Sequence, residues 1–300
     1  MKYFLFFFKI IFFSFIKKKK IHFNYDIKNK TWFGTGGKAQ IFFQPENLKD
    51  LVSLIKNLPK NINIFTIGLG SNIIIRDGGI PGVVIKLNNG FNKIEILNDE
   101  KIIVGCGLKN MNLVKFCLEN NYGGFEFLSG IPGSIGGSIK MNAGCFQNSI
   151  SDTLIEIKAI NRNGDIVKVN KKEIIFDYRY SSISDDWIII EASFKIFKKN
   201  SIKLKKIINK LSDERKKTQP INTRTGGSTF KNPKSLKAWK LIDDANYRGK
   251  KIGGAEVSEK HSNFIINNGN ATSLDLELLG EKIIKKVYKN SQVKLKWEIK

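Results

Sequence analysis

The stretch from Gly123 to Gly144, GGFEFLSGIPGSIGGSIKMNAG, has the composition of a loop that binds a negatively charged group. It is rich in glycine and serine, contains Pro132 and carries few charges. Glycine and proline prevent one regular helix or strand over its whole length, and bare backbone lets N–H groups approach a ligand. Its apolar residues, among them Phe127 and Ile135, predict that the loop is packed inside the protein. A buried loop must satisfy its polar groups, and an anionic cofactor would accept their hydrogen bonds.

A second glycine motif, GLGSN from Gly68 to Asn72, has the composition of an anion-binding nest between two strands. It is not a Walker loop, because no Gly-Lys-Ser/Thr follows it. A G-x-G-x-x-A spacing at Gly34, Gly36 and Ala39 matches a dinucleotide fingerprint only superficially. No apolar strand precedes that spacing, and a strand-like run follows where a helix is required.

Cysteine and histidine usage argues against metal chemistry. The chain has three cysteines, Cys106, Cys117 and Cys145, without a CxxC spacing, and two isolated histidines. This pattern predicts neither a metal site nor a disulfide framework, and it favours a reducing cytoplasm.

Length and composition are those of a globular protein of two or three modest domains. The chain has 300 residues, 41% hydrophobic and 26% charged, with a formal net charge of +24. Such a charge would suit nucleic acid, a membrane surface or an anionic substrate. The lysines are scattered and no nucleic-acid motif accompanies them, so we interpret the charge as a solvated basic surface.

Residues 1–20 form an apolar and basic N-terminal extension, MKYFLFFFKIIFFSFIKKKK. Its apolar part is too short for an ordinary spanning helix and lacks the layout of a signal peptide. We expect a non-essential extension outside the fold, and a short membrane-surface anchor is the alternative.

The remaining pattern alternates short strands with amphipathic helices, which predicts an α+β fold. Strands are predicted at 41–43, 62–67, 73–75, 82–87, 93–97, 101–107, 187–197 and 292–300, with a hairpin turned at Asn163-Gly164. Helices are predicted at 46–57, 109–121, 201–219 and about 236–245. A last helix is expected after Thr272, with Asp275 at the capping-box position.

A set of motifs in this chain resembles the UDP-N-acetylenolpyruvoylglucosamine reductase (MurB) family of flavoenzymes. They are TWFGTGGKA, IGLGSN, GCG, FLSGIPGSIGGSIKMNAG, FDYRYS, GGSTFKNP, GGAEVSEKHSNFIINNGNAT and LKWE. They occur in the family's order from about Thr31 to Glu298, and their spacing is similar to the shorter branch, which lacks a tyrosine-bearing insertion. The N-terminal extension departs from the family. So does the chain end two residues after Glu298, which predicts a frayed terminus there.

The resemblance implies a PCMH/vanillyl-alcohol-oxidase-type FAD-binding domain of two subdomains at 21–198 and a smaller α+β substrate-binding domain at 199–300. It implies non-covalent FAD, NADPH as hydride donor, and reduction of UDP-N-acetylglucosamine enolpyruvate to UDP-N-acetylmuramate. The product serves peptidoglycan synthesis and hence cell shape and division. We expect a cytoplasmic monomer without metal or nucleic acid, with membrane contact only through the extension.

The resemblance also assigns residues. By position, FAD would be bound by Gly68, Gly70, Ser71, Asn72, Gly130, Ile131, Pro132, Gly133, Gly136, Gly137, Asn142, Ala143 and Gly144. Arg179 would bind the substrate carboxylate with its two-point fork. Ser228 would donate a proton to the enolate formed after hydride addition, and Glu298 would polarise the carboxylate. Tyr178, Lys231 and Asn232 would contact substrate.

Without the resemblance, each of these residues has an ordinary structural interpretation. A lone arginine is usually a surface ion-pair partner, Ser228 a turn residue and Glu298 an exposed strand carboxylate. His261 is expected to satisfy hydrogen bonds in the core, and Cys145 to be a small buried hydrophobe.

Two other functions fit parts of the sequence. An oxidase or dehydrogenase with the same FAD fold would leave GGSTFKNP unexplained. A basic nucleic-acid or membrane-surface binder would leave the glycine loops without a ligand and would be colourless.

Overall fold

The computed structural model of the protein describes residues 21–87 and 89–300. The predicted extension at 1–20 therefore lies outside the described residues. The chain forms two compact units, each assembled from separate stretches. In its described part the first unit contains 21–25, 39–68 and 81–204, and the second contains 26–38, 69–80 and 205–300. Residues 26–38 and 69–80 thus group with the C-terminal residues in the second unit.

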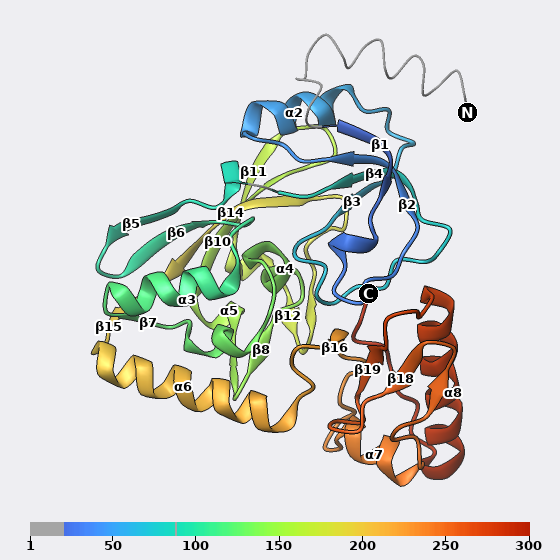
Figure 1. The fold of residues 1–300 in the computed structure, drawn as a ribbon. Coiled ribbons are helices and arrows are strands. Elements are labelled where there is room, and N and C mark those ends of the chain that lie inside the picture. Colours follow the sequence, from blue (N-terminus) through green and yellow to red (C-terminus); the bar gives the residue numbers. More distant parts are fainter. Residues whose placement is uncertain (1–20, 88) are drawn as a thin grey trace. The chain divides into compact units, whose positions relative to one another are not determined.

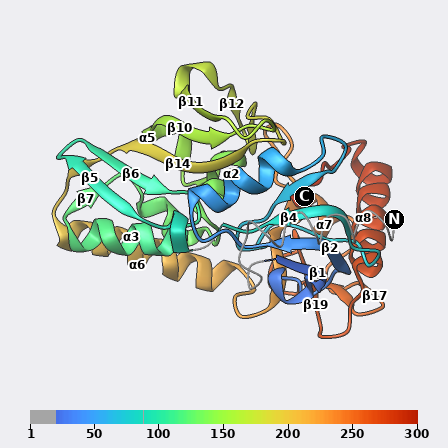
Figure 2. The same ribbon diagram turned by 90° about the horizontal axis from the view of Figure 1, so that it is seen from above.

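Two sheets form the frame of the first unit (Figure 1 and Figure 2). The four-stranded sheet has the order β1-β2-β4-β3, from β1 (Ile21–Asp26), β2 (Lys38–Phe43), β4 (Ile80–Ile85) and β3 (Ile64–Thr66). The five-stranded sheet has the order β11-β10-β14-β6-β5, from β11 (Ile166–Asn170), β10 (Leu154–Ile160), β14 (Ile188–Lys195), β6 (Lys101–Gly105) and β5 (Ile94–Asn98). In the five-stranded sheet all neighbouring strands pair antiparallel, whereas β3 and β4 of the four-stranded sheet pair in parallel.

The core of the first unit forms where helix α2 (Leu48–Asn57) covers the four-stranded sheet (Figure 1). The Asn47 side chain accepts a hydrogen bond from the N–H of Asp50 and so begins the helix. Leu51 and Ile55 on its apolar face belong to the same buried cluster as Phe43 of β2 and Ile160 of β10. The predicted helix at 46–57 is confirmed, with its first turn two residues later than the pattern suggests.

Short elements complete the first unit. The helices are α3 (Asn110–Glu119), η4 (Glu126–Gly130), α4 (Ile135–Lys140) and α5 (Ile150–Thr153), with η3 (Asn89–Phe91) and η5 (Lys171–Glu173) as single turns. The two-stranded pairs are β7 (Tyr122–Gly123) with β15 (Phe197–Lys198), β8 (Gly144–Cys145) with β9 (Asn148–Ser149), and β12 (Phe176–Asp177) with β13 (Tyr180–Ser181). The predicted hairpin is confirmed, since Ile160 pairs with Ile166 and Gly164 has a φ of +80°. The unit boundary falls within α6 (Ser201–Thr218).

The second unit contains one four-stranded sheet packed against helices (Figure 1). Its order is β16-β19-β18-β17, from β16 (Arg224–Ser228), β19 (Phe264–Asn267), β18 (Ala255–Val257) and β17 (Lys251–Ile252), with η2 (Lys28–Lys30), α7 (Ala238–Asp244) and α8 (Ser273–Ser291). Thr272 and Asp275 form the predicted capping box of α8. The Asp77 carboxylate caps the same helix by accepting from the N–H groups of Ser273 and Leu274 at 3.0 and 3.1 Å.

Two of the predicted strands are not present in the structure. Residues 73–75 and 292–300 form no regular strand, although Trp297 makes an isolated bridge with Phe230. The reason is that the C-terminal segment changes partner. Lys296 accepts from Lys231, whereas Lys300 accepts from the N–H of Ile74 at 2.7 Å, so neither pairing extends into a ladder.

Candidate functional site

The glycine-rich loop of the first unit is packed inside, as its apolar residues predict. Phe125, Phe127, Leu128, Ile135 and Ile139 are all buried. The loop folds as the single turn η4 followed by the short helix α4, and Ser134 caps α4 by accepting from the N–H of Gly137 at 3.4 Å. The helix is short because it contains adjacent glycines, which have poor helix propensity.

Hydrogen bonds within the protein use several of the N–H groups expected to bind the cofactor. The N–H of Ile131 donates to Leu128, that of Gly136 to Cys106, and that of Ala143 to Ser138. By contrast, the N–H groups of Gly133 and Ser134 have no acceptor among the described residues. Fewer N–H groups of this loop can therefore donate to a cofactor than its glycine content suggests.

Two further features of this loop fit a bound polar group. Ser129 Oγ is buried and has no hydrogen-bond partner within the described part of the chain. A Cβ added at the neighbouring Gly130 would meet no atom within 4 Å. An unsatisfied buried hydroxyl beside open space is unfavourable unless a ligand fills the space, so these residues fit a cofactor such as FAD.

The first residue of GLGSN lies against this loop. A Cβ at Gly68 would lie 2.4 Å from Ser134 Oγ, so a larger residue would displace the hydroxyl that caps α4. The carbonyl oxygen of Gly68 accepts from Lys86 Nζ at 2.5 Å. Sequence reasoning missed Ser129 and Ser134, although both lie inside the motif it selected, because a serine hydroxyl alone gives no sign of burial.

The remaining residues of GLGSN belong to the second unit. Gly70 has a φ of +68° and its Cβ would lie 1.9 Å from the carbonyl oxygen of Lys30. The carbonyl oxygen of Gly70 accepts from the N–H of Trp32 at 2.9 Å, so the TWFGTGG motif packs on this turn. Asn72 Nδ2 donates to the carbonyl oxygen of Glu298 at 3.3 Å. The turn thus contacts the C-terminal segment, and Ser71 lies between these contacts.

Arg179 occupies the tip of the β12–β13 hairpin in the first unit. Asp177 pairs with Tyr180, which leaves Tyr178 and Arg179 as a two-residue turn. Arg179 has a φ of +56°, a left-handed conformation that costs an L-residue about 1–2 kcal/mol. Its guanidinium lies 4.9 Å from the centre of the Tyr178 ring. Strain of this kind is often kept where the side chain has a function.

The same hairpin is tied to the glycine-rich loop. Asn142 Nδ2 donates to the carbonyl oxygen of Asp177 at 3.0 Å, and Ser181 Oγ donates to that of Lys140 at 2.9 Å. The structure therefore brings Arg179 and Tyr178 together with Asn142 from the set assigned to the cofactor.

Ser228 and Glu298 lie on neighbouring segments of the second unit, and both are half-buried. Ser228 pairs with Phe264 at the end of β16. The N–H of Glu298 donates to the carbonyl oxygen of Thr229 at 2.9 Å. The N–H of Lys300 also donates to Asn72, so the backbone around Glu298 is paired on both sides. A frayed terminus was expected here, and the structure instead holds it by these bonds.

The two other predicted substrate contacts follow Ser228 directly. The N–H of Lys231 donates to the carbonyl oxygen of Lys296 at 2.9 Å. Asn232 Oδ1 accepts from the N–H of Ala238 at 2.9 Å, at the first turn of α7. Asn232 therefore has a structural role that its sequence position did not indicate.

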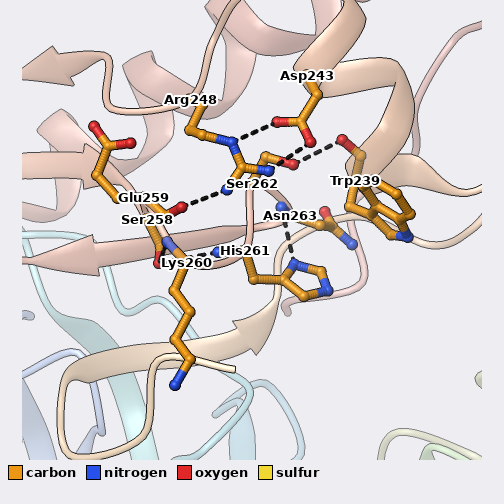
Figure 3. A network of polar contacts seen from close by, with 9 residues as sticks. All are labelled: Trp239, Asp243, Arg248, Ser258, Glu259, Lys260, His261, Ser262 and Asn263. Carbon is orange, nitrogen blue, oxygen red and sulfur yellow. Dashed lines mark hydrogen bonds and ion pairs between the residues drawn. The ribbon is translucent and has the colours of Figure 1, made fainter. Parts of the chain in front are cut away.

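His261 satisfies hydrogen bonds within the fold (Figure 3), as expected. Its Nδ1 accepts from the N–H of Asn263 at 3.3 Å, and burial lowers the pKa of the imidazole. Cys145 is only partly buried, and its Sγ lies 3.2 Å from the carbonyl oxygen of Phe127.

Comparison with known proteins identifies the family. Residues 39–170 match the model of an FAD binding domain, and residues 219–300 match that of the UDP-N-acetylenolpyruvoylglucosamine reductase C-terminal domain. The reductases of that name from Rickettsia prowazekii and Rickettsia felis are each 50% identical to this chain over 277 residues, covering 92% of it and 94% of each relative. This chain belongs to the UDP-N-acetylenolpyruvoylglucosamine reductase family.

A solved structure extends the likeness to the whole fold. The crystal structure of UDP-N-acetylenolpyruvylglucosamine reductase (MurB) from Thermus caldophilus has a TM-score of 0.81 and 27% sequence identity, covering 94% of this chain and 97% of that one. The predicted PCMH-type FAD-binding domain followed by an α+β C-terminal domain is thus confirmed. Membership of this family makes the protein an FAD-domain oxidoreductase. In the part of the chain that the structure describes, no helix is long and apolar enough to span a membrane.

Proposed function

We propose that this protein is an NADPH-dependent FAD reductase that converts UDP-N-acetylglucosamine enolpyruvate to UDP-N-acetylmuramate. The observation that carries the proposal is the pairing of the Ser228 and Glu298 segments within the domain that matches the reductase C-terminal model. The 50% identity to a reductase of that name over 92% of the chain supports the substrate. We place the step in cytoplasmic peptidoglycan precursor synthesis, consistent with three cysteines that remain thiols.

The cofactor, when bound, would carry hydride from NADPH to the methylene carbon of the enolpyruvyl group. Gly68, Ser129, Gly130 and the backbone of Gly133 and Ser134 would hold its polar groups in the first unit. This set rests on the unsatisfied Ser129 hydroxyl, the open space at Gly130 and the unused N–H groups of the loop.

Arg179 would bind the carboxylate of the enolpyruvyl group. Hydride addition to the methylene carbon leaves negative charge on the adjacent carbon and on the carboxylate, and a guanidinium stabilises that charge in a two-point fork. The left-handed backbone at Arg179 supports this role. Glycine would adopt the same φ without strain, so an arginine at this position indicates a function for its side chain.

Ser228 would donate its hydroxyl proton to the carbon that bears the charge. A serine hydroxyl is a weak acid, so it serves only when the acceptor is strongly basic and the hydroxyl is held nearby. Glu298 would polarise the carboxylate and favour charge on the carbon that receives the proton. Tyr178, Lys231 and Asn232 would contact the rest of the substrate, Lys231 as a charge partner for phosphate or carboxylate.

A product assay tests this proposal. The purified protein is incubated with NADPH and the enolpyruvyl sugar nucleotide, and the product is identified by mass spectrometry. The proposal predicts a product two hydrogens heavier than the substrate, formed in equal amount to the NADPH consumed. If NADPH is consumed equally fast without the sugar nucleotide and no reduced sugar nucleotide forms, the substrate assignment is wrong.

A further inference from the structure

The turn between β18 and β19 is held by its own side chains (Figure 3). Ser258 Oγ accepts from the N–H groups of Lys260 and His261 at 3.2 and 3.4 Å. Ser262 Oγ donates to the carbonyl oxygen of Trp239 in α7 at 2.7 Å. Together with the bond from Asn263 N–H to His261 Nδ1, these contacts fix the backbone that carries the Asn263 side chain.

Asn263 forms three hydrogen bonds with the segment that follows Ser228. Its Oδ1 accepts from the N–H of Phe230 at 3.0 Å, and its Nδ2 donates to the carbonyl oxygen of Phe230 at 2.8 Å. Its own carbonyl oxygen accepts from the N–H of Thr229 at 2.7 Å. Asn263 is 4% exposed, so these bonds are shielded from water. The Asn263 carboxamide thus makes the two hydrogen bonds to Phe230 that the backbone of a neighbouring strand would otherwise make.

The sheet needs this side chain because its regular pairing is interrupted. The register of β16 against β19 shifts between Thr225 and Ser228, where Gly227 has a φ of +83°. A shift of this kind ends a ladder or redirects a side chain. Beyond Ser228, the carboxamide of Asn263 satisfies both polar groups of Phe230. These groups would otherwise be buried without partners, since Phe230 is 1% exposed.

Resting on the function proposed above, we infer that Asn263 is a positioning residue for Ser228 and Glu298. The segment that it holds carries Ser228 at one end, and its Thr229 carbonyl oxygen accepts from Glu298 N–H at 2.9 Å. Displacement of Phe230 would therefore move the predicted proton donor and the predicted carboxylate partner together. Asn263 does not touch substrate in this inference; it acts through the backbone of Thr229 and Phe230.

Asn263→Asp and Asn263→Leu test the inference. Aspartate keeps the shape and one acceptor but loses the donor to Phe230, whereas leucine loses both groups at similar volume. We expect flavin reduction by NADPH within about twofold of wild type, and reoxidation by the enolpyruvyl nucleotide slowed by about 10- to 100-fold. The solvent deuterium isotope effect on reoxidation should rise, because proton transfer becomes rate-limiting when its donor is displaced.

Amide hydrogen exchange gives a readout independent of turnover. Faster exchange is expected in the peptides that contain Phe230 and Glu298, with unchanged exchange in β10 and β14. Asn290→Leu is the control, because the exposed Asn290 side chain makes one bond, of 3.4 Å, to the carbonyl oxygen of Asp244. It should change neither half-reaction nor the exchange of these peptides.

The outcomes separate this inference from the proposed function. If Ser228→Ala fails to slow reoxidation, the proton-donor role is wrong and the inference is overturned with it. If Ser228→Ala slows reoxidation but both Asn263 variants keep the wild-type rate and isotope effect, only the Asn263 inference is overturned. Equal loss of both half-reactions in the Asp variant would also overturn it, since that result indicates a general structural role.

Discussion

The N–H of Glu298 donates to the carbonyl oxygen of Thr229 at 2.9 Å, which places the last glutamate of the chain beside the residue after Ser228. Thr229 and Glu298 are 69 positions apart in the sequence, and this hydrogen bond joins the two neighbouring segments that carry them. The bridge between Phe230 and Trp297 fixes the same register. This arrangement motivates the tests of the proton-transfer step.

Replacement of Ser228 by alanine should separate the two half-reactions. The Ser228→Ala variant loses the proposed proton donor, so reoxidation of the flavin by substrate should slow by about 10²- to 10⁴-fold. Reduction by NADPH should be unchanged, and both rates are measured by stopped-flow absorbance. Ser291→Ala, which removes a hydroxyl that bonds Val287 and Val293 at the end of α8, serves as the control. Equal damage to both half-reactions would contradict the proposed role.

Substitution of Arg179 should reduce the substrate half-reaction while leaving the free energy of unfolding nearly unchanged. Arg179→Lys keeps the charge but loses the two-point fork, so the substrate half-reaction should weaken. Arg179→Gly should abolish that half-reaction while its free energy of unfolding stays within about 1 kcal/mol of wild type, because relief of the left-handed strain offsets the entropy of glycine. Urea denaturation and substrate-driven reoxidation measure the two effects. Unchanged turnover in both variants would remove Arg179 from the carboxylate site.

Gly130→Ala tests the cofactor site directly. The added methyl group meets no protein atom within 4 Å, so the flavin-free protein should keep its stability. If the open space is where FAD binds, the Kd for FAD should rise at least about tenfold. Gly78→Ala is a matched control, because its Cβ also meets nothing within 4 Å. Unchanged FAD affinity in Gly130→Ala would place the cofactor elsewhere.

The ion pair between Glu126 and Lys199 predicts a pH dependence of stability. Burial raises the pKa of the Glu126 carboxyl, but hydrogen bonds from Lys199 and from the N–H of Gly124 outweigh it and lower the pKa. A lowered folded-state pKa stabilises the fold above the unfolded value of about 4.3, and this contribution is lost as pH falls through the folded-state pKa.

Glu126→Gln should therefore flatten the fall in unfolding free energy on acidification below about pH 5, as measured by urea denaturation. At neutral pH the variant should be less stable than wild type, because Lys199 loses its charged partner. A variant with the same acid profile as wild type would show that another carboxyl governs this range.

The elements with strong local signals could be predicted from sequence. The hairpin at Asn163-Gly164 and the capping box of Thr272 and Asp275 depend on residues a few positions apart, so the sequence contains all the information they need. The burial of the Gly123–Gly144 loop also follows from its apolar residues.

Features that depend on distant partners could not be predicted. The C-terminal segment pairs first with Thr229 to Lys231 and then with Asn72 to Ile74, which no periodicity of residues 292–300 indicates. The bonds from Asn263 to Phe230 span 33 positions, and Asn263 alone suggests only a polar loop residue. Several N–H groups of the glycine-rich loop donate to other groups of the protein, because buried backbone donors need acceptors within the fold.

The most direct test of the central claim is one absorption experiment on the purified protein under anaerobic conditions. Spectra are recorded as isolated, after NADPH, and after the enolpyruvyl sugar nucleotide. The account predicts a yellow protein that bleaches with NADPH and recovers its colour only with that nucleotide. A protein that bleaches but does not recover would contradict the substrate assignment. A colourless protein that takes up no added FAD would contradict the interpretation of the Gly123–Gly144 loop itself.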